Sequence, residues 1–341
     1  MLPNRFQPVK LFAFFCKKDK NGDNFYLFGD QFFPRFDNRS EIINPPLDIK
    51  AGFEKYLKKP HLSINICQWD VMVYMNQEIG ASLEQITSHS DIVCYRGFLK
   101  ELALIPLGEN SKNTYVAFMF NGIIFIERIN SSTCPISKKD IEKEYMKKKL
   151  SKICTIPHHK KYPDVNSSVV LEEGYYVAKT RVFKTTNSTI KVMFIGDVDA
   201  IDPNNTFTGS SYMKIKVCPG HIMHLLKGSG LHKTWAQSFI AGNEVIAAGI
   251  RKKSLVREVK YFNISELESK LPVIPSNIME FLGKCLENII CACKKYPNKY
   301  IIIPEDKVSL RVEEEENVRN INFSRPTQAF LKTFSVKRCN K

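Results

Sequence analysis

Two acidic residues stand two positions apart in the apolar stretch VMFIGDVDAI. Asp197 and Asp199 lie in a run whose composition predicts a β-strand. Carboxylate oxygens are the ligands that hard cations such as Mg²⁺ prefer, so the pair could belong to a metal site. A second strand-like run, SYMKIKV, follows after a loop rich in Pro, Asn and Gly, and it carries Lys214 and Lys216. The sequence therefore predicts either a metal site that has been altered or a hairpin that never held a metal.

Composition limits the class of protein. The chain has 341 residues, 43% hydrophobic and 25% charged, which is typical of a globular core and excludes a disordered or fibrous protein. The 50 Lys and Arg residues outnumber the 35 Asp and Glu residues and give a formal net charge of +15. This excess favours polyanionic partners through counterion release, so nucleic acid is the expected partner and a solvated basic surface is the alternative.

The cysteines and the apolar runs indicate the cellular compartment of the protein. The ten cysteines are scattered without the spacing of a zinc site, so we expect reduced thiols in the cytosol or nucleus. No stretch reaches the roughly 18 consecutive apolar residues of a membrane span, and we expect a soluble intracellular protein that does not bind membranes.

Strand-like runs dominate the first two thirds of the chain. We expect strands at residues 91–97, 102–107, 115–120 and 123–129, arranged as an antiparallel meander, with Asn121-Gly122 as a type I′ hairpin turn. Residues 136–153 predict a charged amphipathic helix, and the segment 177–183 could be helix or strand. A hairpin over 245–262 and a long helix from Pro275 follow.

The chain shows no internal repeat and no low-complexity linker, which favours one continuous α/β domain over residues 1–316. We expect residues 317–341 to form a partly solvated tail. Its apolar residues, Phe330 and Phe334 among them, could dock on the body or on a partner.

Several motifs in a fixed order resemble one known family. They are DIVCYRGFLKEL, the paired strands around FNG, GDVDAID, KIK, and KTWAQSFIAG followed by VIAAGIR. Together they resemble the decapping exonucleases of the DXO family. This resemblance implies a PD-(D/E)xK nuclease-like fold, a single domain with two mixed or antiparallel sheets flanked by helices around a central cleft. It also implies action on RNA 5′ ends, by decapping and 5′ to 3′ degradation, with two divalent ions.

The family's functional positions carry over only in part. The positions that match its pattern are Arg96, Asp197, Asp199, Lys216 and Gln237. At two positions an acid of the family is replaced, by Lys214 and by Ser151, and Lys147 stands where the family has glycine. Glu172 or Glu173 could supply the missing acid from a shifted register.

The replaced acids decide the predicted activity. An ammonium in place of a carboxylate changes the local charge by about two units, and unit charges ~4 Å apart interact by about 4 kcal/mol at an effective dielectric near 20. We therefore expect no Mg²⁺ or Mn²⁺ site and only the remnant pair Asp197 and Asp199. The cations and the amide that would bind an RNA phosphate are Arg96, Lys214, Lys216 and Gln237. The alternative to RNA binding is a cleft that no longer binds any ligand.

Two classes of function follow. In the first, the protein is an inactive member that shields RNA 5′ ends and scaffolds other factors. Resemblance to inactive germline members then implies a nuclear location and gene silencing, with a 5′ to 3′ exonuclease or heterochromatin-bound piRNA-cluster factors as partners. In the second, it is a slow Mg²⁺- or Mn²⁺-dependent hydrolase of RNA 5′ ends.

Overall fold

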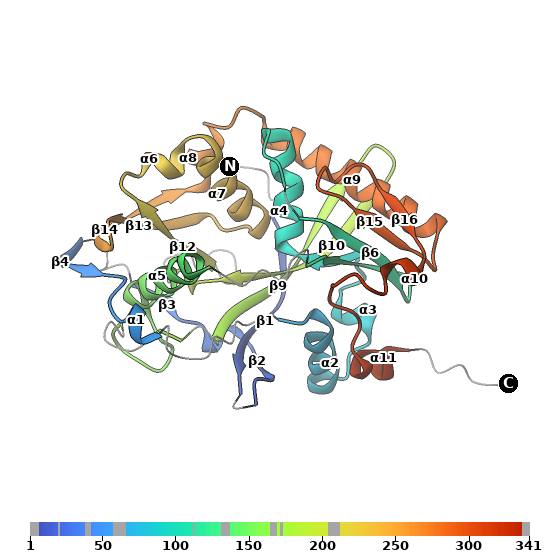
Figure 1. The fold of residues 1–341 in the computed structure, drawn as a ribbon, viewed down its shortest axis with the longest axis horizontal. Coiled ribbons are helices and arrows are strands. Elements are labelled where there is room, and N and C mark those ends of the chain that lie inside the picture. Colours follow the sequence, from blue (N-terminus) through green and yellow to red (C-terminus); the bar gives the residue numbers. More distant parts are fainter. Residues whose placement is uncertain are drawn as a thin grey trace.

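The computed structural model describes residues 7–19, 21–37, 42–56, 66–111, 113–130, 137–163, 169–170, 173–203 and 212–335. These residues form two β-sheets with helices packed on their faces (Figure 1). The predicted class, a single α/β domain with two sheets flanked by helices, is confirmed.

The larger sheet has nine strands in the order β16-β15-β6-β7-β5-β10-β9-β1-β2. Its strands in chain order are β1 (Val9–Lys18), β2 (Asn24–Phe28), β5 (Ile92–Tyr95), β6 (Tyr115–Phe120), β7 (Ile123–Arg128), β9 (Glu173–Lys184), β10 (Thr189–Val198), β15 (Tyr300–Ile303) and β16 (Arg311–Glu313). β5 pairs in parallel with both β10 and β7, whereas the other pairs are antiparallel. The sheet is therefore mixed.

The second sheet has seven strands in the order β4-β14-β13-β12-β11-β3-β8. They are β3 (Arg35–Phe36), β4 (Ile42–Asp48), β8 (Thr155–Ile156), β11 (Ala200–Ile201), β12 (Tyr212–Pro219), β13 (Val245–Lys252) and β14 (Leu255–Asn263). β10 of the first sheet is separated from β11 of the second by one residue, Asp199. The predicted acids therefore lie where the chain passes from one sheet to the other.

Helices cover both faces of the large sheet (Figure 1). On one face lie α4 (Arg96–Leu104), α7 (Gly228–Ala241) and α9 (Pro275–Lys295), packed in a core that contains Trp235. On the other face lie α2 (Gln68–Ile79), α3 (Leu83–Ile86) and α11 (Gln328–Phe334), packed around Trp69. Both tryptophans are 0% exposed.

The second sheet is covered by α5 (Lys138–Cys154), which packs Met146 and Leu150 against apolar residues of β12 and β13. The remaining short helices are α1 (Phe53–Tyr56), α6 (Met223–Leu226), α8 (Ile264–Glu268) and α10 (Glu315–Val318). No helix among the described residues is both long enough and apolar enough to span a membrane.

Some predicted elements are confirmed and others are wrong. Asn121 and Gly122 have φ of 48° and 78° and join β6 to β7, as the hairpin signal predicts. The predicted strand at 102–107 is wrong, because these residues complete α4 and a 3-10 turn, Ile105–Leu107. The antiparallel meander is wrong at the same point, since α4 separates β5 from β6 and β5 pairs in parallel with β7.

The ambiguous segment 177–183 lies within strand β9. Within the predicted tail, the described residues 317–335 include α11, whose Phe330 ring lies 5.0 Å from that of Trp69 and is 0% exposed. Phe334 packs on Phe330 at the same centroid distance of 5.0 Å. Residues 336–341 lie outside the described residues.

Candidate functional site

The two acids are held against the strand that carries Lys214. Asp197 is the second-last residue of β10, and Asp199 follows the end of that strand. The backbone N–H of Asp199 donates to the carbonyl of Met213 at 3.2 Å. In return, the backbone N–H of Ile215 donates to the Asp199 carboxylate at 2.8 Å. These bonds bracket Lys214, so the position of its backbone is fixed relative to both acids.

Lys214 points back from β12 at the acids. Its Nζ donates to the carboxylate of Asp197 and lies 3.2 Å from Oδ2 of Asp199. The Lys214 side chain is 2% exposed and that of Asp199 is 9% exposed. Since burial of an unpaired ammonium costs several kcal/mol, the two carboxylates are what make this position tolerable for lysine.

Two further cations reach the same acids from two helices. The guanidinium of Arg96, the first residue of α4, donates to the Asp197 carboxylate and, at 2.6 Å, to the Asp197 carbonyl. Gly196 leaves room for this side chain, because a Cβ there would lie 3.1 Å from Cδ of Arg96. From α5, Nζ of Lys147 lies 3.7 Å from Oδ2 of Asp197 and 3.9 Å from Oδ1 of Asp199.

These cations keep both acids ionised. Burial alone would raise the pKa of Asp197, but Arg96, Lys214 and Lys147 hold that pKa well below the usual range of a carboxyl. Burial also opposes ionisation of Asp199, and Lys214 and Lys147 together lower its pKa. Conversely, Asp199 raises the pKa of Lys147 against the effect of burial. Both acids are thus neutralised by protein cations at neutral pH.

Lys216 and Gln237 pair with each other. Nζ of Lys216 donates to Oε1 of Gln237 in α7 at 2.8 Å. Burial, with repulsion from Lys214 and Lys147, lowers the pKa of Lys216 to about 7. The Lys216 ammonium therefore titrates near neutral pH.

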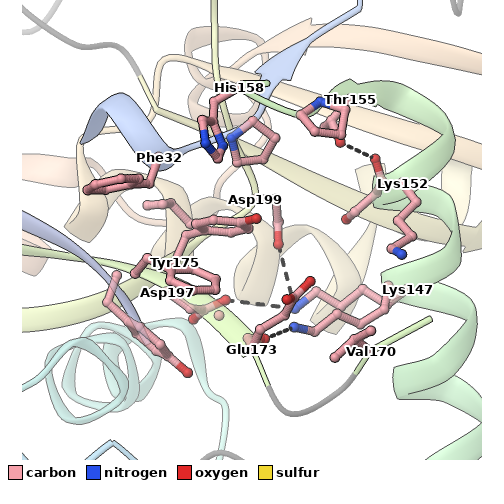
Figure 2. A pocket seen from close by; sticks show the side chains of 18 of the residues that line it. Phe32, Lys147, Lys152, Thr155, His158, Val170, Glu173, Tyr175, Asp197 and Asp199 are labelled. Atoms are coloured by element: carbon pink, nitrogen blue, oxygen red, sulfur yellow. Dashed lines mark hydrogen bonds and ion pairs between the residues drawn. The ribbon is translucent and has the colours of Figure 1, made fainter. Parts of the chain in front are cut away.

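A pocket of about 580 Å³ opens beside the acids. Figure 2 shows α5 along one side of it, with Lys147 and Lys152, and Phe32, His158 and Tyr175 across from this helix. The polar and aromatic residues that line it include Phe15, Phe32, Glu144, Lys147, Lys148, Ser151, Lys152, His158, His159, Lys160, Glu173, Tyr175, Tyr176, Asp197 and Asp199. Arg96, Lys214, Lys216 and Gln237 are not among the lining residues, although Arg96 and Lys214 contact Asp197, which is.

Ser151, at the position where the family has an acid, faces the pocket. Ser151 lines it one helical turn beyond Lys147 on α5. Glu173, one of the two alternatives for this acid, also lines it, and its backbone carbonyl accepts from Nζ of Lys148 at 2.5 Å. The other alternative, Glu172, lies outside the described residues. Within the part of the chain that the structure describes, no three His, Cys, Asp or Glu side chains form a group that could hold a metal ion.

Sequence reasoning did not identify the aromatic residues of the pocket. Phe32, His158 and Tyr175 come from three separate segments, and none belongs to the motifs that carry the family resemblance. The signal that was available is local: the dipeptides His158-His159 and Tyr175-Tyr176 both follow the basic helix in the sequence.

A family model and two curated relatives match most of the chain. Residues 7–333 match the family model described as RAI1 like PD-(D/E)XK nuclease. The chain is 22% identical over 323 residues to the decapping nuclease RAI1 of Debaryomyces hansenii, covering 82% of this chain and 81% of that protein. It is 22% identical over 283 residues to the decapping nuclease dom-3 of Caenorhabditis elegans, covering 76% and 70% of the two chains.

Solved structures share the fold at low sequence identity. Candida albicans Rai1 in complex with pU5-Mn²⁺ has a TM-score of 0.70 and 18% identity, over 92% of both chains. Scheffersomyces stipitis Rai1 in complex with (3′-NADP)⁺ and calcium ion has a TM-score of 0.71 and 19% identity, over 96% of this chain and 95% of that one. The resemblance seen in the sequence is confirmed, and the chain belongs to the RAI1-like PD-(D/E)XK nuclease family.

Proposed function

We propose that this chain binds RNA 5′ ends in the pocket beside Asp197 and does not hydrolyse them. The observation that carries the proposal is the buried Lys214, whose ammonium contacts Asp197 and lies 3.2 Å from Asp199. The Lys214 ammonium thus occupies the position beside both carboxylates in which they would coordinate a metal ion.

The residues present do not fit the divalent ions that this fold implies. Mg²⁺ and Mn²⁺ prefer several oxygen ligands, and a two-metal site needs enough carboxylates to neutralise both ions. Here Asp197 and Asp199 face three protein cations, Arg96, Lys147 and Lys214. A divalent ion at these acids would have to displace Lys214, whose side chain is 2% exposed. No hydrolytic step is therefore assigned to this site.

The same cations suit a terminal phosphate. Lys147 lines the pocket with its side chain 32% exposed, so a phosphate could reach its ammonium directly. Arg96 and Lys214 lie behind and contribute through their charge. Candida albicans Rai1 was solved in complex with pU5-Mn²⁺, which supports an oligonucleotide as the ligand here.

The alternative is a slow metal-dependent hydrolase of RNA 5′ ends. Glu144 and Glu173 favour it, because both line the same pocket as Asp197 and Asp199. If both Lys147 and Lys214 moved away from the acids, the four carboxylates could offer oxygen ligands that the resting arrangement lacks.

Titration with Mn²⁺ distinguishes the two functions. An ion that binds a specific site stabilises the folded state by RT ln(1 + [L]/Kd). The melting temperature of the protein then rises with the concentration of free ion. We expect no rise for the wild type at millimolar Mn²⁺, and no degradation of 5′-phosphorylated or 5′-triphosphorylated RNA, while both RNAs bind. Metal-dependent degradation that stops in Asp199→Ala would contradict the proposal.

Restoring the residue types that the family has at these positions is a sharper test. The combined variant Lys147→Gly, Ser151→Glu and Lys214→Glu removes two cations from the acids and adds two carboxylates. We expect this variant, and not Lys139→Gly in the same helix, to gain a saturable Mn²⁺-dependent rise in melting temperature.

The scaffold role extends the proposal to partners. Resemblance to inactive germline members of the family supports a nuclear location and contact with a 5′ to 3′ exonuclease or with heterochromatin-bound piRNA-cluster factors. Imaging of the tagged chain together with crosslinked purification from nuclei tests both. Exclusion of the tagged chain from nuclei would contradict this part alone.

A further inference from the structure

We infer that the side chain of Glu127 is a neutral carboxylic acid that donates its proton to Gln68 and so holds the start of helix α2 on strand β7. A rise in pH ionises the acid and loosens this joint. The device lies outside the pocket and does not depend on the proposed function.

Glu127 occupies a position where the strand pattern calls for an apolar side chain. Ile123, Phe125 and Glu127 alternate along β7 and therefore point to the same face of the sheet. Ile123 and Phe125 pack there in the core that contains Trp69. Glu127 is 3% exposed, so its carboxyl group is removed from water together with them.

The Glu127 carboxyl group has no cation to compensate a charge. Among the described residues it makes no ion pair within 4.0 Å. Glu101, a second buried glutamate, instead lies 3.7 Å from Nζ of Lys307. Because an unpaired buried carboxylate is far more costly than the neutral acid, burial raises the pKa of Glu127 to about 8, although the Gln68 amide opposes this effect in part.

The titratable groups on the surrounding elements do not supply the missing positive charge. They are Asp70 of α2, Cys94 and Tyr95 of β5, Arg128 of β7 and Arg325, which follows the β-bridge of Phe323 to Ile129. Burial raises the pKa of Cys94 and of Tyr95, so both are neutral at neutral pH. Arg128 is exposed and, as the next residue along the strand, points to the opposite face. Arg325 donates to the carbonyl of Val318 at 2.6 Å.

The hydrogen bond to this carboxyl group comes from Gln68. Nε2 of Gln68, the first residue of α2, donates to Oε1 of Glu127 at 2.5 Å. Gln68 is 0% exposed, and its amide oxygen Oε1 has no donor. A carboxylic acid can pair with a primary amide through two bonds, N–H to the acid and O–H to the amide oxygen. A proton on Glu127 therefore satisfies the amide oxygen, whereas a carboxylate has no hydrogen to donate.

The backbone of Gln68 ties α2 to the strand that leads into the site. Its N–H donates to the Tyr95 hydroxyl at 3.0 Å, and this hydroxyl donates to the carbonyl of Ile66 at 2.9 Å. Tyr95 is the last residue of β5 and precedes Arg96. The acid and the amide thus hold the place where α2, β7 and β5 meet, one residue from Arg96.

The test compares the wild type with Glu127→Gln by urea unfolding across pH. The glutamine amide N–H can replace the acid O–H, so the pair with Gln68 persists but cannot ionise. Between the usual glutamate pKa of about 4.3 and about 8, the folded wild type binds more protons at this position than the unfolded state does. The unfolding equilibrium constant of the wild type, divided by that of the variant, should therefore increase with pH by up to about tenfold per unit.

Other titrating groups are common to both proteins and cancel in this ratio. A ratio that does not change with pH would show that Glu127 is charged in the folded protein and would overturn the inference.

Glu101→Gln is the matched control, because it removes the same charge from a buried glutamate that has a cation. At about pH 8 we expect Glu127→Gln to be at least as stable as the wild type. Glu101→Gln should be less stable, since it leaves the buried Lys307 without its acid. Losses of the same size in both variants would contradict a neutral Glu127.

Carbon-13 NMR of the wild type, labelled at the glutamate carboxyl carbons, tests the acid directly even if a variant does not fold. We expect one resonance to have the shift of a neutral acid at about pH 6 and to reach that of a carboxylate only near pH 8. If every glutamate is already a carboxylate at about pH 6, the inference fails.

Hydrogen exchange locates the joint. After correction for the intrinsic rate, the α2 amides should lose protection as pH rises through about 8, and those of Glu127→Gln should not. Unchanged protection of α2 in the wild type would show that the proton does not hold this helix.

Discussion

Nζ of Lys214 lies 3.2 Å from Oδ2 of Asp199, and both side chains are buried. Lys214 belongs to β12 of the seven-stranded sheet. Asp199 directly follows β10, the strand of the nine-stranded sheet from which the chain passes into the seven-stranded sheet. The ion pair therefore links the two sheets where the chain crosses from one to the other.

Removal of the buried ammonium should be costly. We expect Lys214→Met to lower the free energy of unfolding by about 3 kcal/mol, because it leaves buried carboxylates with less compensation. Lys147→Met removes a cation from the same acids, but its side chain is 32% exposed, and we expect about 1 kcal/mol. Urea unfolding at neutral pH measures both, and equal losses would contradict the difference in burial.

Lys216 should contribute a stability that rises with pH above neutrality. The pKa of Lys216 is lowered by burial to about 7, so between that pH and the usual lysine pKa the unfolded state binds more protons than the folded state. The free energy of unfolding then increases with pH, by at most about 1.4 kcal/mol per pH unit for this group.

The control for this effect is Lys216→Met, whose unfolding free energy should vary less between pH 7 and 9. Lys179, whose pKa burial also lowers to about 7, would leave a residual slope in the variant. A slope that is unchanged by the Lys216 substitution would show that this lysine stays charged.

Helix α11 should be part of the cooperative fold. Phe330 is 0% exposed against Trp69, so Phe330→Ala should lower the free energy of unfolding by about 3 kcal/mol or more. Phe25→Ala, at a side chain that is 49% exposed, should change it by less than about 0.5 kcal/mol. A small effect at Phe330 would mean that α11 detaches without unfolding the body.

Recognition of the terminal phosphate should depend on Lys147. We expect Lys147→Ala to weaken binding of 5′-phosphorylated RNA by about tenfold, the value of one hydrogen bond to a charged group. Binding of the same RNA with a 5′ hydroxyl should change much less. Lys139→Ala, in the same helix but outside the pocket lining, is the control for general charge.

The sequence predicted the elements whose signals are local. The Asn121-Gly122 hairpin, the helix from Pro275 and the strand that carries Asp197 all follow from turn chemistry or periodicity within a short window. The segment 102–107 was misassigned because a short apolar run is compatible with either a strand or a buried helix. Its environment, between α7 and α9, decides the outcome and is not encoded locally.

The site was predictable in its residue types and less so in its geometry. The motif order brought Arg96, Asp197 and Lys214 to one place, and the structure has them in contact. The sequence did not reveal that Lys214 would be sealed behind the pocket, because burial depends on the packing of β12 under α5. The aromatic residues of the pocket were missed because Phe32, His158 and Tyr175 come from three separate segments that meet only in the tertiary fold.

The ammonium groups at the acids come from separate parts of the chain, Lys147 from a helix and Lys214 from a strand. Exchange of either lysine leaves the other beside the same carboxylates. A single codon change at Lys147 or at Lys214 therefore cannot remove both lysine ammonium groups from the acids. The charge balance of the two carboxylates thus has two independent sources in the chain.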